Sequence, residues 1–166
     1  PGWRWFHSRH AASYKLMPVF EAGGFADTME VACRWSQIVP LYHAVRAAVS
    51  PYGIIMAHMS HAYQEGGSIY FSFAGKGNLK TYEQVWQAAM SAVLAQGATV
   101  THHHGVGVLK KSAATREVGF AVQGWREAKQ VHDSDSIMNP GILFGDDDGS
   151  EAPPAPEIQA EDGLIA

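Results

Sequence analysis

The chain has 166 residues, of which 46% are apolar, enough for one domain with a core of its own. It contains no run of about 20 apolar residues, so we expect no membrane span. After residue 145 there are seven acidic residues and no lysine or arginine, so the formal net charge of −4 for the whole chain becomes about +3 for residues 1–145. This mildly positive charge suits a small anionic ligand but not a nucleic acid.

The chain divides into a folded part and a tail. We predict one domain over residues 1–145 and a disordered tail over 146–166, which is acidic and contains three of the eight prolines. Because the chain opens on Pro1 rather than Met, we expect it to be a piece of a longer protein. The single Cys33 cannot form an internal disulfide, which fits a reducing compartment, so we expect a cytoplasmic location.

The first predicted element is a helix. Asp27 followed by Glu30 has the spacing of a capping box. Six apolar residues then recur at helical spacing: Val31, Trp35, Ile38, Tyr42, Val45 and Val49. Pro40 lies within this run, so we expect a kink or a break there, and residues 50–53 end the helix.

A hairpin follows the first helix. Two strand-like runs, residues 54–62 and 68–74, are separated by a segment that contains two glycines. Side chains alternate between the two faces of a strand. We therefore expect one face to carry Met59, His61 and Tyr63, the opposite face His58, and a shared face in the second strand Ile69, Phe71 and Phe73.

Residues 81–96 are predicted to form a second helix, because apolar residues recur there at helical spacing. Thr81 and Gln84 would form its capping box, and Gly97 would end it. A short strand over residues 98–101, a last helix over 113–130 and a turn at residues 139–141 complete the chain. This order predicts an α+β fold with helices packed on one face of an antiparallel sheet.

Three adjacent histidines, His102, His103 and His104, precede Gly105 and Gly107. Histidine titrates near neutral pH and can donate, accept or ligate, while glycine lets the backbone approach a ligand closely. We predict a site here; the alternative is that one or two rings pack in a turn. Consecutive residues of an extended backbone point to opposite faces, so we favour hydrogen bonding or proton transfer at an anionic substrate over a metal site, which would need further ligands such as His58 or His61.

Three other residues are candidates for the site. Tyr63, beside the hairpin turn, is a candidate general acid or base, with amphipathic packing as the alternative. Lys110 follows the triplet and would add positive charge there, or lie in a solvated basic turn. Arg9 lies in an aromatic-rich segment and would bind an anion or make a surface cation–π contact.

Four segments carry a family resemblance. They are Ala26-Asp27-Thr28-Met29-Glu30 with Trp35, His58-Met59-Ser60-His61-Ala62-Tyr63 followed by Gly67-Ser68-Ile69-Tyr70-Phe71, Thr101-His102-His103-His104-Gly105-Val106-Gly107, and Ile137-Met138-Asn139-Pro140-Gly141. In this order they resemble the C-terminal half of FAD-linked oxidases of the vanillyl-alcohol-oxidase superfamily, in the alkylglycerone-phosphate synthase-like branch. The triplet with its Gly-Val-Gly is the most specific part.

The resemblance implies a substrate (cap) domain with a ferredoxin-like sheet, packed over the isoalloxazine ring of FAD. The FAD would be held mainly by another domain of the same parent protein. It implies that Tyr63 is the catalytic acid or base, that His102, His103 and His104 are catalytic, and that His103 and Asn139 lie near the cofactor. With Arg9, His61 and Lys110 as substrate-binding residues, we expect a small-molecule substrate, no metal and no nucleic acid, and leave a homodimer open.

Two departures bear on the substrate. Related D-lactate and glycolate dehydrogenases have a histidine where this chain has Ser68, which disfavours their metal-assisted chemistry here. The synthases have an arginine, thought to hold the substrate phosphate, where this chain has Leu16, so we expect a less charged or larger apolar alcohol, amine or hydroxyacid. A D-2-hydroxyacid dehydrogenase cap domain and a non-catalytic ligand- or metal-binding module remain as alternatives.

Overall fold

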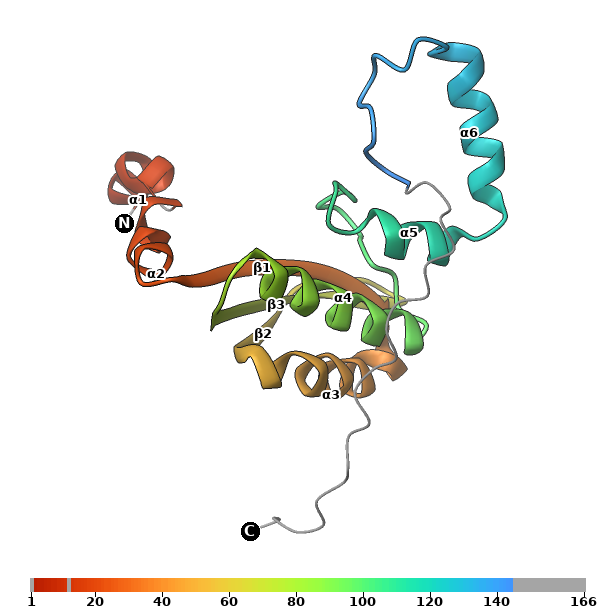
Figure 1. Cartoon of the computed structure of the whole chain (residues 1–166). Coiled ribbons are helices and arrows are strands. Elements are labelled where there is room, and N and C mark those ends of the chain that lie inside the picture. The colour runs from red at the N-terminus through yellow and green to blue at the C-terminus, as the bar shows by residue number, and fades with distance from the viewer. Residues whose placement is uncertain (1, 12, 145–166) are drawn as a thin grey trace.

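The computed structural model describes residues 2–11 and 13–144 and has a three-stranded antiparallel sheet at its centre (Figure 1). The predicted acidic tail lies outside the described residues. No helix in the described part is long and apolar enough to cross a membrane. In chain order the helices and strands are α1 (Gly2–Ser8), α2 (Met17–Glu21), β1 (Gly24–Arg34), α3 (Ile38–Val49), β2 (Gly53–Ala62), β3 (Gly66–Lys76), α4 (Leu79–Ala95), α5 (Lys111–Val118) and α6 (Ala121–His132).

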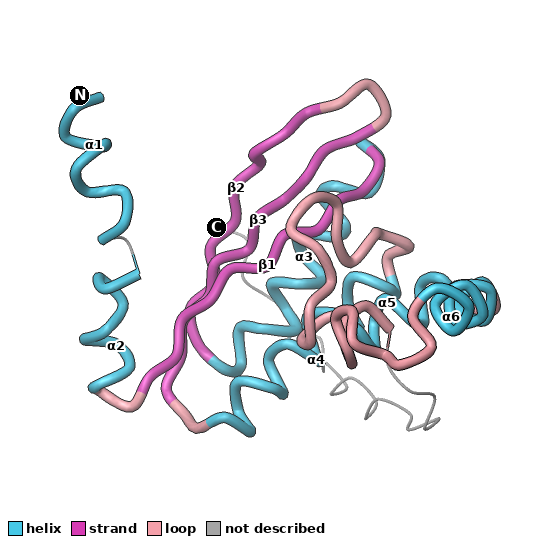
Figure 2. Tube along the Cα trace, turned by 90° about the horizontal axis from the view of Figure 1, so that it is seen from above, coloured by secondary structure: helices cyan, strands magenta, loops and turns pink. Residues whose placement is uncertain are grey.

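The sheet has β3 in the middle, paired antiparallel with β1 on one side and β2 on the other. Helices α3 and α4 pack together against one face of it (Figures 1 and 2). The predicted face of Ile69, Phe71 and Phe73 is confirmed, since all three side chains are buried in this core. Burial of each large apolar side chain contributes about 1.5–3 kcal/mol. The predicted α+β class, with helices on one face of an antiparallel sheet, is confirmed.

The helix predicted from Asp27 onward is wrong in its first part. Residues 24–34 pair along their whole length with β3, so they form the strand β1. Asp27 caps no helix, because its carboxylate accepts hydrogen bonds from Tyr82 and Trp86 of α4. The helix begins only at Ile38, so Pro40 is its third residue and causes no break. A proline is tolerated there because the N–H groups of the first turn have no partner within the helix.

Two further helix boundaries differ from the predicted ones. Helix α4 begins at Leu79, and its N-cap is Asn78, whose side chain accepts from the backbone N–H of Thr81 at 3.2 Å. The predicted capping box of Thr81 is therefore wrong, whereas Gly97 follows the helix end with φ +64° as expected. The single helix predicted over residues 113–130 is two helices, α5 and α6, because the chain turns at Gly119 with φ +62°.

The strand predicted over residues 98–101 is reduced to one β-bridge. Thr99 and Ala32 exchange backbone hydrogen bonds with N–O distances of 2.9 and 3.2 Å, on the edge of β1 that β3 leaves free. This bridge holds the segment before the histidine triplet against the sheet.

A half-buried tyrosine–aspartate contact in this fold predicts a pH dependence of stability. Burial, followed by the hydrogen bond and charge of Asp27, raises the pKa of Tyr82 from 10 to about 12. The neutral phenol is favoured in the folded state, so this contribution is fully present below about pH 10 and is lost as the pH rises toward 12. We expect the free energy of unfolding to fall less steeply over this range in Tyr82→Phe than in the wild type, measured by urea denaturation. Tyr14→Phe, which alters an exposed tyrosine, should keep the wild-type slope; equal slopes in all three proteins would contradict the prediction.

Candidate functional site

The candidate site lies on the face of the sheet opposite α3 and α4. The strand register places Glu30 of β1 opposite Tyr70 of β3, and Tyr70 opposite His58 of β2. Because Phe71 faces the helices, its neighbour Tyr70 faces the other side. The loop that carries the histidine triplet lies over this face and contacts these side chains. We call this side of the sheet the open face.

A β-bulge brings a second histidine of β2 to the open face. The pairing shifts between Met59 and His61, so that His61 lies opposite Ser68. The extra residue, Ser60, places His58 and His61 on the same face, whereas simple alternation would separate them. The predicted opposition of His58 and His61 is therefore wrong, and so is the predicted shared face of Met59 and His61, since Met59 pairs with Ile69 on the helix side.

His61 connects the hairpin to the triplet. Its ring lies edge-on to His103 with 4.7 Å between ring centroids. On its other side it stacks on Tyr63, at 6.2 Å and nearly parallel. The expected pairing of His61 with Tyr63 is thus present in the structure.

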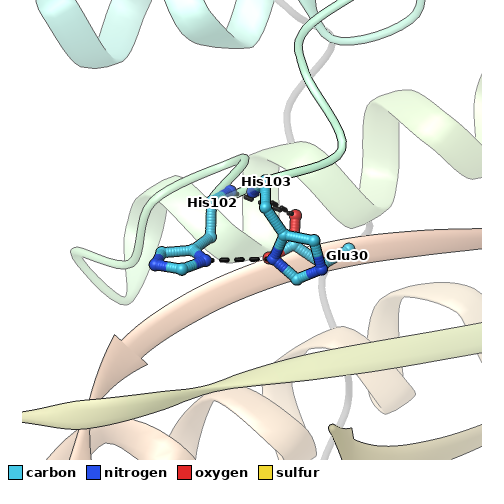
Figure 3. A group of neighbouring side chains, drawn as sticks. All are labelled: Glu30, His102 and His103. Carbon is cyan, nitrogen blue, oxygen red and sulfur yellow. Dashed lines mark hydrogen bonds and ion pairs between the residues drawn. The ribbon is translucent and has the colours of Figure 1, made fainter. Parts of the chain in front are cut away.

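Glu30 forms the floor of the site. Its side chain is fully buried, and Oε2 accepts the backbone N–H groups of His102 and His103 at 3.0 and 3.4 Å (Figure 3). The other oxygen, Oε1, lies 3.4 Å from His103 Nδ1 and has no hydrogen bond with any residue that the structure describes. The carboxylate therefore anchors the backbone of the triplet and faces one of its rings.

Lys110 supports Glu30 from the protein interior. Its Nζ donates to the Glu30 backbone oxygen at 2.6 Å, and the residue is only 4% exposed. Burial lowers the pKa of Lys110, while the charges of Glu30 and Asp27 oppose that shift. Burial alone would raise the pKa of Glu30, but the backbone N–H groups of His102 and His103, with the charge of Lys110, outweigh it and leave this pKa below its usual value. Glu30 is thus ionised at neutral pH.

Tyr70 is the phenol most closely bound to the triplet. Its hydroxyl forms a short hydrogen bond with His103 Nε2. Its ring meets the edge of His104 at 4.9 Å and stacks on His58 at 5.0 Å. We did not single out Tyr70 from the sequence, although it belongs to a quoted segment and lies two residues from Ser68 along a strand, a spacing that puts both on one face.

Tyr63 lies at the rim of the site rather than at its centre. Its ring centroid is 5.0 Å from that of His102, and the side chain is 46% exposed. Within the described part of the chain its hydroxyl makes no hydrogen bond. It borders a cavity of about 680 Å³ that His102 and Arg34 also line.

Three residues predicted from the sequence are not brought to the open surface of the site. Arg9 belongs to the N-terminal helical segment, which extends away from the sheet (Figure 1), and its guanidinium lies over Phe6 at 3.8 Å. Lys110 is buried beneath Glu30, where a substrate does not reach it. Asn139 lies beyond α6, in a segment that contacts that helix through the bond from Lys129 to the Met138 carbonyl.

The sequence of this chain matches a known class of protein domain. Residues 4–143 match the family described as FAD linked oxidases, C-terminal domain, and the chain belongs to this family.

Its curated relatives include alkyldihydroxyacetonephosphate synthases. The proteins from Dictyostelium discoideum and Trypanosoma brucei brucei are 27% and 26% identical, each over 87% of this chain. An uncharacterized FAD-linked oxidoreductase of Escherichia coli O157:H7 is 24% identical over 84% of the chain. The chain spans 26%, 25% and 33% of the length of these three relatives.

A solved structure of alkyldihydroxyacetonephosphate synthase has a similar fold. It matches 84% of this chain and 24% of its own with a TM-score of 0.57 and 21% sequence identity. At this identity the match supports the fold, and the chemistry has to be argued from the residues of the site.

Proposed function

We propose that this chain is the substrate domain of an FAD-dependent oxidoreductase or of an enzyme similar to alkylglycerone-phosphate synthase, and that it completes the active site over a flavin held mainly by another domain of the same protein. The observation that carries the proposal is the cluster of Tyr70, His103 and Glu30 on the open face of the sheet, in a chain that belongs to this family.

The open face fits a position against a flavin. It carries phenol and imidazole groups, which donate and accept hydrogen bonds, and the core helices α3 and α4 lie on the opposite face. FAD, when bound, supplies a two-electron redox centre. The residues of this chain bind and orient the substrate beside that centre and move its proton. His103 is the triplet residue proposed to lie near the cofactor, and Asn139 is proposed to contact the flavin domain.

The proton is proposed to pass through Tyr70 and His103. A general acid or base must lie within hydrogen-bond reach of the group that it serves, and a phenol hydrogen-bonded to an imidazole can give up or regain its proton. Tyr63, the catalytic residue implied by the family resemblance, is the second candidate, because it borders the 680 Å³ cavity together with His102. His61 and His104 flank these groups and are proposed to contact the substrate.

The substrate is proposed to be less charged than an acylated dihydroxyacetone phosphate. Arginine binds phosphate with two charge-assisted hydrogen bonds that an aliphatic side chain cannot supply. Leu16 occupies the position of that arginine, and it lies in the segment that extends away from the sheet (Figure 1). Titration of the full-length protein with the acyl phosphate, followed by flavin absorbance, should show no micromolar binding; tight binding that requires the phosphate would overturn this choice of substrate.

The sheet is proposed to be a ferredoxin-like sheet with a reduced fourth strand. The order β1–α3–β2–β3–α4 followed by the bridge at Thr99 corresponds to a βαββαβ arrangement in which the last strand is one residue pair.

The single-domain boundary at residue 145, the cytoplasmic location and the homodimer stay predictions.

The proposal that another domain of the full-length protein holds the flavin can be tested directly. The full-length protein should copurify with FAD, and its flavin should be reduced by a substrate of the proposed class. The 166-residue chain alone should be colourless, because the flavin is held mainly elsewhere. Flavin bound to the chain alone near one equivalent, or a full-length protein without flavin, would contradict the proposal.

A further inference from the structure

The two oxygens of the buried Glu30 carboxylate differ in their contacts. The fold explains the role of Oε2 but not that of Oε1. Oε2 is occupied by the backbone N–H groups of His102 and His103, which explains how the triplet loop is held. Oε1 is buried without a hydrogen bond and lies 3.4 Å from the Nδ1 atom of His103. A buried acceptor without a donor costs about 1–3 kcal/mol, so an N–H group beside it is favoured over a second lone pair.

Only one neutral tautomer of His103 places an N–H group, rather than a lone pair, beside Oε1. With the proton on Nδ1, the ring N–H lies 3.4 Å from the carboxylate oxygen, an electrostatic contact without a hydrogen bond, and Nε2 is left to accept the hydroxyl proton of Tyr70. With the proton on Nε2, two lone pairs would face each other between Nδ1 and Oε1. The tautomer protonated at Nδ1 also fits the hydrogen bond at 3.0 Å between Nδ1 of His103 and Nδ1 of His102, in which His102 accepts the His103 proton.

We propose that Glu30 is a positioning residue that holds His103 in the tautomer protonated at Nδ1, so that Nε2 can take the proton of Tyr70. Lys110 completes the arrangement, since its bond to the Glu30 backbone oxygen fixes the residue and its positive charge offsets the buried carboxylate. This inference rests on the proposed function of Tyr70 and His103 and adds the residue that prepares them.

A metal ion is the competing explanation of the same atoms. Glu30, His102 and His103 each offer one ligand atom, and these atoms lie within 4.8 Å of one another. However, Lys110 already supplies a positive charge next to Glu30, and a divalent cation would place further positive charge beside this buried ammonium group. Elemental analysis distinguishes a bound metal from the positioning role.

The test is the tautomer of His103, read from the ¹⁵N shifts of its ring nitrogens in the full-length, flavin-loaded protein labelled with ¹⁵N-histidine. The signals are assigned by their loss in His103→Ala. The wild type should show the proton on Nδ1, and a neutral ring protonated at Nε2 would overturn the proposal without any variant at Glu30. This readout needs no turnover, so it is separate from a failure of the proposed function.

Glu30→Gln sharpens the test. The Gln oxygen can still accept the two backbone N–H groups, but its NH₂ would face His103 Nδ1 and drive the ring proton to Nε2. We expect this change of tautomer together with a fall in kcat of about 10²-fold or more and little change in KM.

The matched control is Glu117→Gln. Glu117 also accepts a backbone N–H just before the triplet, that of Val100 at 2.8 Å, but among the described residues it is not paired with a histidine ring. The Glu117→Gln variant should keep the wild-type tautomer of His103. The proposal would be overturned if Glu30→Gln also kept the wild-type tautomer of His103, or if both variants changed that tautomer alike. It would also be overturned if elemental analysis of the wild type found one equivalent of metal that Glu30→Gln loses.

Discussion

Replacement of Tyr70 by phenylalanine should reduce turnover of the full-length enzyme by about 10²–10⁴-fold, the usual contribution of a general acid or base. The variant removes only the hydroxyl that binds His103 Nε2, and it keeps the ring that stacks on His58 and meets the edge of His104. Fold and flavin content should therefore be retained. The rate of flavin reduction in anaerobic rapid mixing measures the effect.

Tyr63→Phe is the informative comparison for this variant. It removes the other candidate phenol, which lies 46% exposed at the rim of the site. A small effect at Tyr63 and a large one at Tyr70 would assign the proton transfer to Tyr70. The reverse result would return the role to Tyr63, as the family resemblance implies, and wild-type rates in both variants would place both tyrosines in packing roles.

The largest expected effect on stability comes from Gly66→Ala, at the start of β3. A Cβ atom there would overlap the backbone oxygen of Cys33 and lie 2.8 Å from the Cα atom of Arg34. Both obstacles are backbone atoms of β1, so β1 and β3 must separate at the end of the sheet where Gly66 pairs with Arg34. We expect the free energy of unfolding to fall by at least about 2 kcal/mol, measured by denaturant unfolding.

Gly124→Ala provides the matched control for this substitution. Gly124 lies inside α6, and a Cβ atom added to it would have no atom within 4 Å. Alanine is favoured over glycine in a helix by about 1 kcal/mol, so this variant should be slightly more stable than the wild type. Equal stability of the two variants would show that the close approach of β1 and β3 is not maintained in solution.

The elements that could be predicted from the sequence are those whose pattern is local. The hairpin has two β-rich runs around a glycine-containing turn, and α4 has apolar residues at helical spacing over its whole length. Strand β1 was mistaken for a helix because Asp27 and Glu30 have the spacing of a capping box. Their actual partners, Tyr82 and the backbone of the triplet, are 55 and 72 residues away along the chain.

The candidate site was predicted in part, for a similar reason. The triplet was found because three histidines before two glycines are conspicuous in any sequence. The role of Tyr70 could not be predicted because it depends on the register of three strands. The face of His61 relative to His58 could not be predicted because a one-residue bulge between them changes the face of every following side chain. Lys110 was expected to face a substrate, but it is buried because Glu30 gives it a partner in the interior.

The measurement that tests the central claim most directly is a crystal structure of the full-length protein with FAD bound. The account predicts that the isoalloxazine ring lies against the open face of the sheet, with the Tyr70 hydroxyl and His103 beside the space left for substrate. A flavin bound on the side of α3 and α4, or an open face that is exposed to solvent far from the flavin, would contradict it.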